Sequence, residues 1–281
     1  DTLGVAVAGS GDPWAERLAD RAAGWGRSDE STVWGTGQRL PAPSTALVNG
    51  YQVHCLEFDS VHEGAVVHAM ATLLPALLAH AERRGGATGQ DVLTAVAVGV
   101  DVASSIGLAS RAPMRFFRPS TAGAFGAVAA VGKLEGFDAD TLIDAFGIVY
   151  GQLCGTLQPH LEASPVLGMQ MGFNARGALT AVDLAAAGLR GPREVLEGRY
   201  GYFKLYEDGA YDLASATAEL GKTWRVTELS HKPFPSGRLT HGTVDGLLRL
   251  LAEHGFAAED VARVTASVPP LVKRLVGRPD I

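Results

Sequence analysis

Cysteine is scarce in this sequence, and a surplus of positive charge is absent. Only Cys55 and Cys154 occur in 281 residues, far apart and without the short spacing of zinc ligands. We therefore expect reduced, buried thiols in a cytoplasmic protein. The formal net charge of −6 argues against nucleic acid or an anionic membrane as the main partner, because both are bound by basic surfaces. A small anionic substrate is compatible with this charge, since a few Arg and Lys side chains can bind it locally.

A long uncharged apolar run is missing as well. The most apolar stretch, residues 92–110, carries Asp101 at its centre, which favours a buried helix over a membrane span. The first ten residues lack the basic start of a secretory signal. They begin directly on an apolar helical pattern, so we expect the protein to extend further upstream.

Most of the chain has the apolar periodicity of helices, and its length suggests two unequal domains. We expect helices at 14–25, from 44 onward, and at 71–84, 90–111, 120–135, 139–153, 170–187, 192–196, 212–220 and 240–254. The segment 120–135 is almost all Ala, Gly and Val. Its neighbours can therefore approach closely, as around a helix at the centre of a bundle.

The character of the sequence changes after residue 222. Segments 224–229 and 261–268 alternate with period two, which predicts two short strands. Two strands cannot satisfy their backbone groups alone, so we expect an incomplete second domain. The predicted fold is mainly α, with an all-helical domain at 1–222 and the start of a smaller α+β domain at 223–281.

One stretch concentrates titratable groups. Residues 49–68 hold three histidines and three carboxylates, in a sequence that otherwise runs through small apolar helices. Groups with tunable pKa gathered in a cavity are typical of an acid/base site. A solvated loop between two helices is the alternative interpretation.

Two further segments combine cations with hydroxyls ahead of a predicted helix. Residues 115–121 place hydroxyls and backbone amides at a helix N-terminus, a favoured place for an anion. Residues 230–241 contain cations, histidines and hydroxyls around Pro233 and Pro235, which stiffen the loop. A plain surface connection is the alternative for this second segment.

Several of these segments together resemble the MmgE/PrpD family. The resemblance rests on residues 49–68, 119–127, 196–198 with 201–203, and 232–236, and it spans nearly the whole chain in consistent order. The family includes 2-methylcitrate dehydratase, cis-aconitate decarboxylase and iminodisuccinate epimerase. The resemblance implies a large all-helical domain, a smaller α+β lid domain, a cleft between them, a homodimer, and no metal or organic cofactor.

The match to the family's motifs has departures. Glu57 and Ser60 stand where the dehydratase and decarboxylase branches have aspartates, and Val61 stands where they have threonine. Arg118 replaces a histidine, and only Leu167 and Gly168 are found where a lysine is usual. His68 is the histidine that matches best.

These residues predict an acid/base site for a carbon next to a carboxylate, which needs a base, an acid on the other side and donors for the substrate carboxylates. His68 and His62 suit the base, because imidazole titrates near neutral pH. Asp59 and His241 are open alternatives for the second acid/base. The predicted substrate-binding side chains are Glu57, Arg118, Ser120, Lys232, Ser236 and Arg238.

Three functions remain open from the sequence. The first is a cofactor-independent lyase, specifically a hydro-lyase on a small di- or tricarboxylate. The second is an isomerase or epimerase on a similar substrate, which the missing threonine and lysine favour. The third is an inactive binding protein of the same fold, because fold alone does not fix function.

Overall fold

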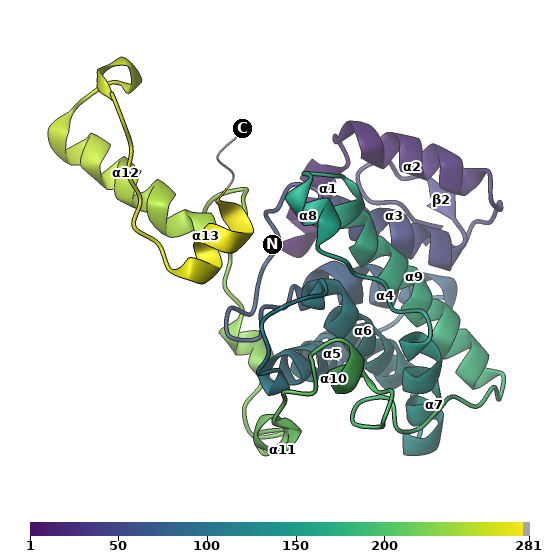
Figure 1. The fold of residues 1–281 in the computed structure, drawn as a ribbon. Helices are drawn as coiled ribbons and strands as arrows, with labels where there is room; N and C mark the ends of the chain where they lie inside the picture. The colour runs from purple at the N-terminus through teal and green to yellow at the C-terminus, as the bar shows by residue number, and fades with distance from the viewer. Residues whose placement is uncertain (278–281) are drawn as a thin grey trace. The chain divides into compact units, whose positions relative to one another are not determined.

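The computed structural model describes residues 1–277 and divides the chain into two units, residues 1–231 and 232–281. The first unit is built almost entirely of helices (Figure 1). In the described part of the chain, the strands are β1 (Ser31–Thr32) and β2 (Arg39–Leu40), an antiparallel pair in which Ser31 faces Leu40. The prediction of a mainly α fold is confirmed.

Most helices lie where the periodicity predicts them. Those of the first unit are α1 (Thr2–Gly9), α2 (Pro13–Ala23), α3 (Ala42–His54), α4 (Ala69–Arg83), α5 (Gly89–Ala109), α6 (Arg118–Glu135), α7 (Ala139–Tyr150), α8 (Gln158–Leu161), α9 (Val166–Ala186), α10 (Tyr202–Leu205), α11 (Leu213–Thr217) and the 3-10 helix η1 (Arg225–Glu228).

The helix predicted at 192–196 is wrong. Two of its carbonyl groups accept hydrogen bonds from residues outside the segment. The amide of Tyr202 donates to the carbonyl of Val195 at 2.7 Å, and the amide of Phe203 donates to the carbonyl of Leu196 at 3.0 Å. The segment forms turns instead.

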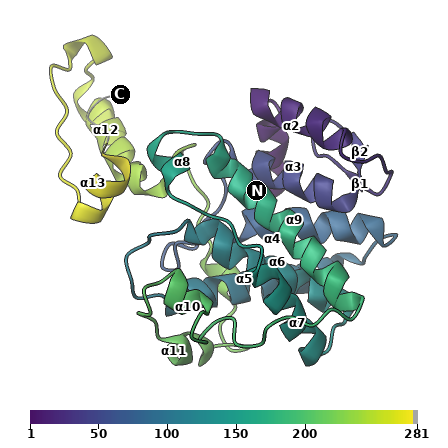
Figure 2. The same ribbon diagram turned by 45° about the vertical axis from the view of Figure 1, so that its right-hand side comes forward.

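Helix α6 lies among α4, α5, α7 and α9, as its small residues predict (Figure 2). A Cβ atom added to Gly99 of α5 would lie 2.6 Å from the carbonyl oxygen of Gly126 in α6, too close for any side chain. The two backbones therefore meet directly, which only glycine permits. Around this crossing Val100, Ala103, Phe125 and the rest of α6 up to Gly132 are buried.

Helix α5 contains residues 92–109 of the apolar run, and Ser110 caps its C-terminus. Within residues 1–277 it is the one helix long and apolar enough to cross a membrane, by length and composition only, and more than half of its apolar window is buried in the fold. Asp101 at its centre is 5% exposed and accepts a hydrogen bond from the amide of Arg225. The predicted buried helix is confirmed.

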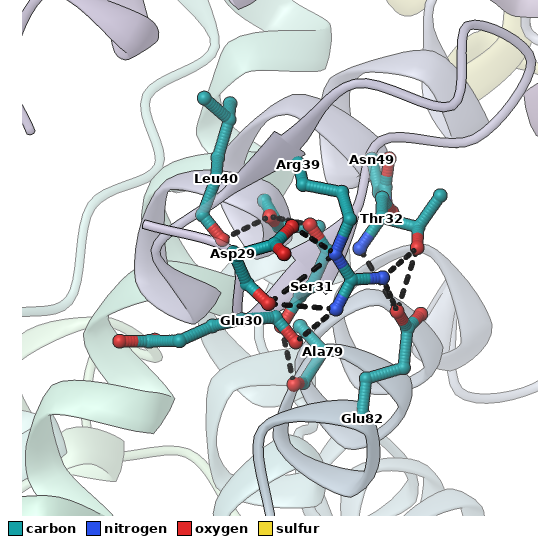
Figure 3. Close-up of polar contacts among 10 residues, drawn as sticks. Asp29, Glu30, Ser31, Thr32, Arg39, Leu40, Asn49, Ala79 and Glu82 are labelled. Carbon is teal, nitrogen blue, oxygen red and sulfur yellow. Dashed lines mark hydrogen bonds and ion pairs between the residues drawn. The ribbon is translucent and has the colours of Figure 1, made fainter. Parts of the chain in front are cut away.

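Helices α3 and α4 flank the charge-dense stretch, and a polar network next to β1 and β2 joins them (Figure 3). Arg39 and Glu82 of α4 form an ion pair at 3.4 Å, and Glu82 also accepts from the amide and hydroxyl of Thr32. From α3, Asn49 donates to the carbonyl of Thr32 at 3.1 Å. These contacts fix the spacing of the two helices whose ends carry the titratable groups.

The second unit contains η2 (Arg238–Thr240), α12 (His241–His254), η3 (Ala258–Asp260) and α13 (Pro270–Val276). Both predicted strands are wrong: 224–229 contains η1, and 261–268 has no regular structure. A strand forms only beside another strand, and the described residues offer neither segment a neighbouring strand. The division into a helical domain at 1–222 and a lid domain at 223–281 stays a prediction, and residues 278–281 lie outside the described part.

Candidate functional site

The charge-dense stretch forms the end of α3, a loop, and the start of α4. Two backbone contacts hold the loop: the amide of Val61 donates to Ser230 at 3.0 Å, and that of His62 to Val67 at 2.9 Å. Glu57 and Val66 have φ of 51° and 53°, a left-handed conformation that side chains rarely adopt. Two such residues in one short loop indicate a backbone held in place by its surroundings, as is frequent at functional sites.

Asp59 lies between two imidazole rings in this loop. Nδ1 of His54 is 3.0 and 3.1 Å from the two carboxylate oxygens, and Nδ1 of His68 is 2.9 Å from Oδ2. The Asp59 side chain is fully buried, whereas those of His54 and His68 are 2% and 11% exposed. The chain thus brings together Asp59 and His68, both predicted site residues, and adds His54. We call these three residues the Asp59 cluster.

Charges within and next to the Asp59 cluster shift the pKa values of His54 and Asp59. Burial by itself would lower the pKa of His54, but the carboxylates of Asp59 and Glu57 outweigh it and raise the pKa to about 10. Burial by itself would raise the pKa of Asp59, but His54 and His68 hold it well below its usual value. At neutral pH, His54 and Asp59 are therefore an ionised pair.

His68 has the geometry of an oriented base. It lies at the start of α4, and its Nδ1–H donates to the carboxylate, which fixes the tautomer with a lone pair on Nε2. Within residues 1–277 no group bonds to Nε2. A carboxylate that orients an imidazole in this way is the arrangement found in catalytic triads and behind metal-bound histidines.

Residues 52–60 contain three buried polar atoms without a hydrogen-bond partner in the described part of the chain. Six buried side-chain atoms in the described residues lack a hydrogen-bond partner, and three of them lie between residues 52 and 60: Gln52 Oε1, His54 Nε2 and Ser60 Oγ. His54 Nε2 lies 3.2 Å from Glu57 Oε1, close enough for charge attraction but not aligned for a hydrogen bond.

The Asp59 cluster could also hold a metal ion, because His54, Asp59 and His68 each offer a ligand atom within 4.8 Å of the others. Two imidazoles and a carboxylate suit zinc or iron. A metal ligand must be deprotonated, however, and the pKa of about 10 keeps a proton on His54 at neutral pH. Metal binding to the Asp59 cluster would therefore have to displace this proton.

His62 is placed differently from His68. Its Nε2 lies 2.9 Å from Glu228 Oε2, and its Nδ1 accepts a hydrogen bond from the amide of Ala65 at 3.1 Å. Both ring nitrogens are thus occupied within the loop. This geometry favours a structural role for His62 over the predicted role as a base.

Arg118 and Ser120 are also occupied. Arg118 donates from Nε and Nη2 to the two oxygens of Glu207, at 2.8 and 2.7 Å, and both side chains are buried. The hydroxyl of Ser120 donates to the carbonyls of Phe117 and Cys154. Phe117, the residue before Arg118, packs against His54 with ring centroids 5.7 Å apart. The segment at 115–121 therefore supports the Asp59 cluster, and substrate binding by Arg118 or Ser120 stays a prediction.

The remaining predicted residues, Lys232, Ser236, Arg238 and His241, belong to the second unit. Contacts between residues of the loop at 230–241 hold that loop in one conformation. The hydroxyls of Ser236 and Thr240 lie 2.8 Å apart, and His241 Nε2 is 3.2 Å from the carbonyl oxygen of Ser236. The ring of His241 also packs against Phe234. The stiff loop predicted from Pro233 and Pro235 agrees with these contacts, and its action on a substrate stays a prediction.

Sequence reasoning missed two residues of this region. His54 was one of the three histidines of the stretch, and its place five residues before Asp59, at the end of a helix, was the available signal. Glu207 offered no signal, because nothing in the sequence links it to Arg118, 89 positions earlier.

Comparison with known proteins gives a consistent match. The model of the MmgE/PrpD N-terminal domain matches residues 1–213. A cis-aconitate decarboxylase-like protein of Aspergillus oryzae is 29% identical over 95% of this chain and 60% of its own length. The cis-aconitate decarboxylase of Aspergillus terreus is 30% identical over 89% of this chain and 54% of its own, and that of Homo sapiens is 27% identical over 99% and 60%. The chain thus spans little more than half the length of these relatives.

Proposed function

Because this chain belongs to the MmgE/PrpD family, we propose that it is part of a lyase acting next to a carboxylate of a small di- or tricarboxylate. The observation that carries the proposal is the hydrogen bond between His68 and the fully buried Asp59, with Nε2 of His68 unpaired among residues 1–277. An oriented imidazole is the proton carrier that such chemistry requires at neutral pH. The relatives' names favour loss of carbon dioxide, whereas the sequence alone favoured loss of water.

Either reaction uses His68 in the same place. In a dehydration, Nε2 removes the proton from the carbon next to the carboxylate, the C–H electron pair becomes a double bond, and hydroxide leaves as water after protonation by a second acid. In a decarboxylation, the C–C bond breaks, carbon dioxide leaves, and the electron pair left on carbon takes a proton from the imidazolium. Negative charge develops on the substrate in both cases and needs fixed donors.

The substrate carboxylates need cations other than Arg118, which already holds Glu207. We propose Lys232 and Arg238 of the second unit for this role, because both lie on the braced loop at 230–241. Arg offers a planar pair of donors that matches a carboxylate. The proposal includes a requirement for the second unit in turnover.

An epimerase is the second candidate, and one observation favours it. Val61 stands where the family's lyases have threonine, so this position supplies no hydroxyl. The Val61 side chain is 3% exposed. Inversion needs only removal of a proton from one face and return to the other.

Incubation with a panel of di- and tricarboxylates in deuterated buffer, followed by NMR, separates these functions. Deuterium uptake with loss of carbon dioxide or water supports the lyase and identifies which bond breaks. Uptake with inversion alone overturns the lyase in favour of the epimerase. Absence of any exchange across the panel, by protein whose fold is confirmed by circular dichroism, favours the binding protein.

A further inference from the structure

Helix α9 carries two buried amide side chains, Gln170 and Asn174, that have no part in the proposed mechanism. We propose that Gln170 is a positioning residue, which holds Phe117 against His54 of the Asp59 cluster by way of segment 154–156. This role rests on the proposed function, but its first two tests read the structure and need no turnover.

Segment 154–156 lies outside the helices and strands, and α9 takes the place of a neighbouring strand for it. Oε1 of Gln170 accepts a hydrogen bond from the amide of Thr156 at 2.6 Å, and Nε2 donates to the carbonyl of the same residue at 3.2 Å. One turn further along, Oδ1 of Asn174 accepts from the amide of Cys154 at 3.4 Å, and Nδ2 donates to its carbonyl at 2.7 Å. Each amide side chain thus binds both backbone groups of one residue, as the backbone of a partner strand does.

The middle residue of the segment, Gly155, contacts the residues that precede α6. The amide of Phe117 donates to the carbonyl of Gly155 at 2.9 Å, and Phe116 forms an isolated antiparallel bridge with Thr156. The two backbones are close, because a Cβ atom added to Gly155 would lie 3.0 Å from the carbonyl oxygen of Phe117. The position of segment 154–156 therefore sets the position of Phe117.

Phe117 in turn covers one side of the Asp59 cluster. Its ring is 6% exposed and packs on the ring of His54, with centroids 5.7 Å apart and planes tilted by 55°. His54 and His68 share the carboxylate of Asp59, so a turn of the His54 ring changes the contact that orients His68. A small misplacement of a reacting group slows a reaction more than it weakens substrate binding. We therefore expect loss of the Gln170 contacts to lower kcat rather than raise KM.

Hydrogen exchange tests whether Gln170 holds the segment. Thr156 is an exposed residue, and its amide donates to Gln170. In the wild type this amide should exchange at least about 10²-fold more slowly than in an unstructured peptide, and Gln170→Met should abolish that protection. Gln152→Met is the matched control, because Gln152 bonds instead to the carbonyls of Ile148 and Gly177. An unprotected Thr156 amide in the wild type overturns the proposal, even if Gln170→Met does not fold.

NMR of the two aromatic rings tests whether the effect reaches the Asp59 cluster. The ring protons of Phe117 and His54 should give a nuclear Overhauser cross-peak in the wild type and in Gln152→Met. The cross-peak should lose intensity in Gln170→Met, because Phe117 then moves away from His54. An unchanged cross-peak in folded Gln170→Met overturns the proposal.

Kinetics with an established substrate give the third test. Gln170→Met should lower kcat by about threefold to tenfold, with KM within about twofold of the wild-type value. Phe117→Leu should act in the same way, and the double variant should be no slower than the slower single variant, because both changes act through one contact. A normal kcat in folded Gln170→Met, or losses that multiply in the double variant, overturns the proposal. If the wild type shows no turnover, the proposed function fails, and the exchange and cross-peak tests still decide whether Gln170 holds Phe117.

Discussion

Two buried carboxylates of the first unit, Asp59 and Glu207, differ in the side chains that bind them: histidines bind Asp59, and an arginine binds Glu207. Glu207 accepts two parallel hydrogen bonds from Arg118 and a longer one, at 3.5 Å, from the hydroxyl of Tyr202. Asp59 is shared between two imidazoles, and Nε2 of one of them, His68, has neither a hydrogen bond nor an ion pair within residues 1–277. Arginine does not release a proton in proteins, whereas histidine does so near neutral pH. Of the two, only the Asp59 cluster can therefore move protons, and the Arg118–Glu207 pair is suited to holding structure.

Removal of His68 should have the largest effect on activity. His68→Ala deletes the proposed base, so turnover should fall by about 10² to 10⁴. The urea midpoint should also fall, because the fully buried Asp59 loses a hydrogen bond, so turnover is compared in samples whose fold circular dichroism confirms. Steady-state kinetics beside urea unfolding measures both. His254→Ala, at an exposed position of α12, is the control for activity, and a near-normal kcat in His68→Ala would remove this residue from the mechanism.

Removal of Glu207 should instead act on stability. Glu207→Ala leaves Arg118 as a buried charge without its partner, which typically costs about 3 to 5 kcal/mol in the free energy of unfolding. Urea unfolding followed by circular dichroism measures the loss. The double variant Glu207→Ala with Arg118→Met should recover part of it, because no charge is then left buried. Equal destabilisation in the single and double variants would contradict this account.

The helices and the acid/base stretch could be predicted from the sequence because both are local signals. Periodicity and glycine placement predict helices α4 to α7. The density of titratable groups identifies residues 49–68 as a candidate site without knowledge of the fold. The roles of His62 and Arg118 could not be predicted, because each depends on a partner that only packing brings near. Glu207 and Glu228 lie 89 and 166 positions from the residues they pair with. The two predicted strands failed for the same reason, since alternation does not supply a neighbouring strand.

Arg238 tests whether the second unit supplies the cation that Arg118 does not. Arg238→Ala should lower kcat/KM by about 1.5 to 3 kcal/mol, the typical value of a charged hydrogen bond, mainly through a higher KM for an anionic substrate. Arg249→Ala, an exposed position on α12 paired with Asp245, is the matched control. Unchanged kinetics in Arg238→Ala would leave the substrate carboxylates to other donors.

The pH dependence of stability should reveal the charged state of His54. Its pKa is raised to about 10 in the folded protein, so the folded state binds one more proton than the unfolded state between about pH 7 and 9. The free energy of unfolding should then fall by up to about 1.4 kcal/mol per pH unit as pH rises through this range. The stabilisation is complete below the unfolded pKa near 6.5. Urea unfolding at pH 6, 7, 8 and 9 measures the slope, and His54→Gln should flatten it.

His62 should show the smallest effect, which makes it the sharpest contrast with His68. Its partner Glu228 is 39% exposed, so water screens the pair, and an exposed ion pair contributes less than about 1 kcal/mol. His62→Gln can keep a donor toward Glu228. We therefore expect the equilibrium constant of unfolding and the turnover rate constant each to stay within about twofold to threefold of the wild-type value. The kinetic assay used for His68→Ala measures this directly. A loss of turnover as large as that of His68→Ala, with stability unchanged, would restore His62 as a proton carrier. It would also show that a hydrogen bond to one of its ring nitrogens breaks during the reaction.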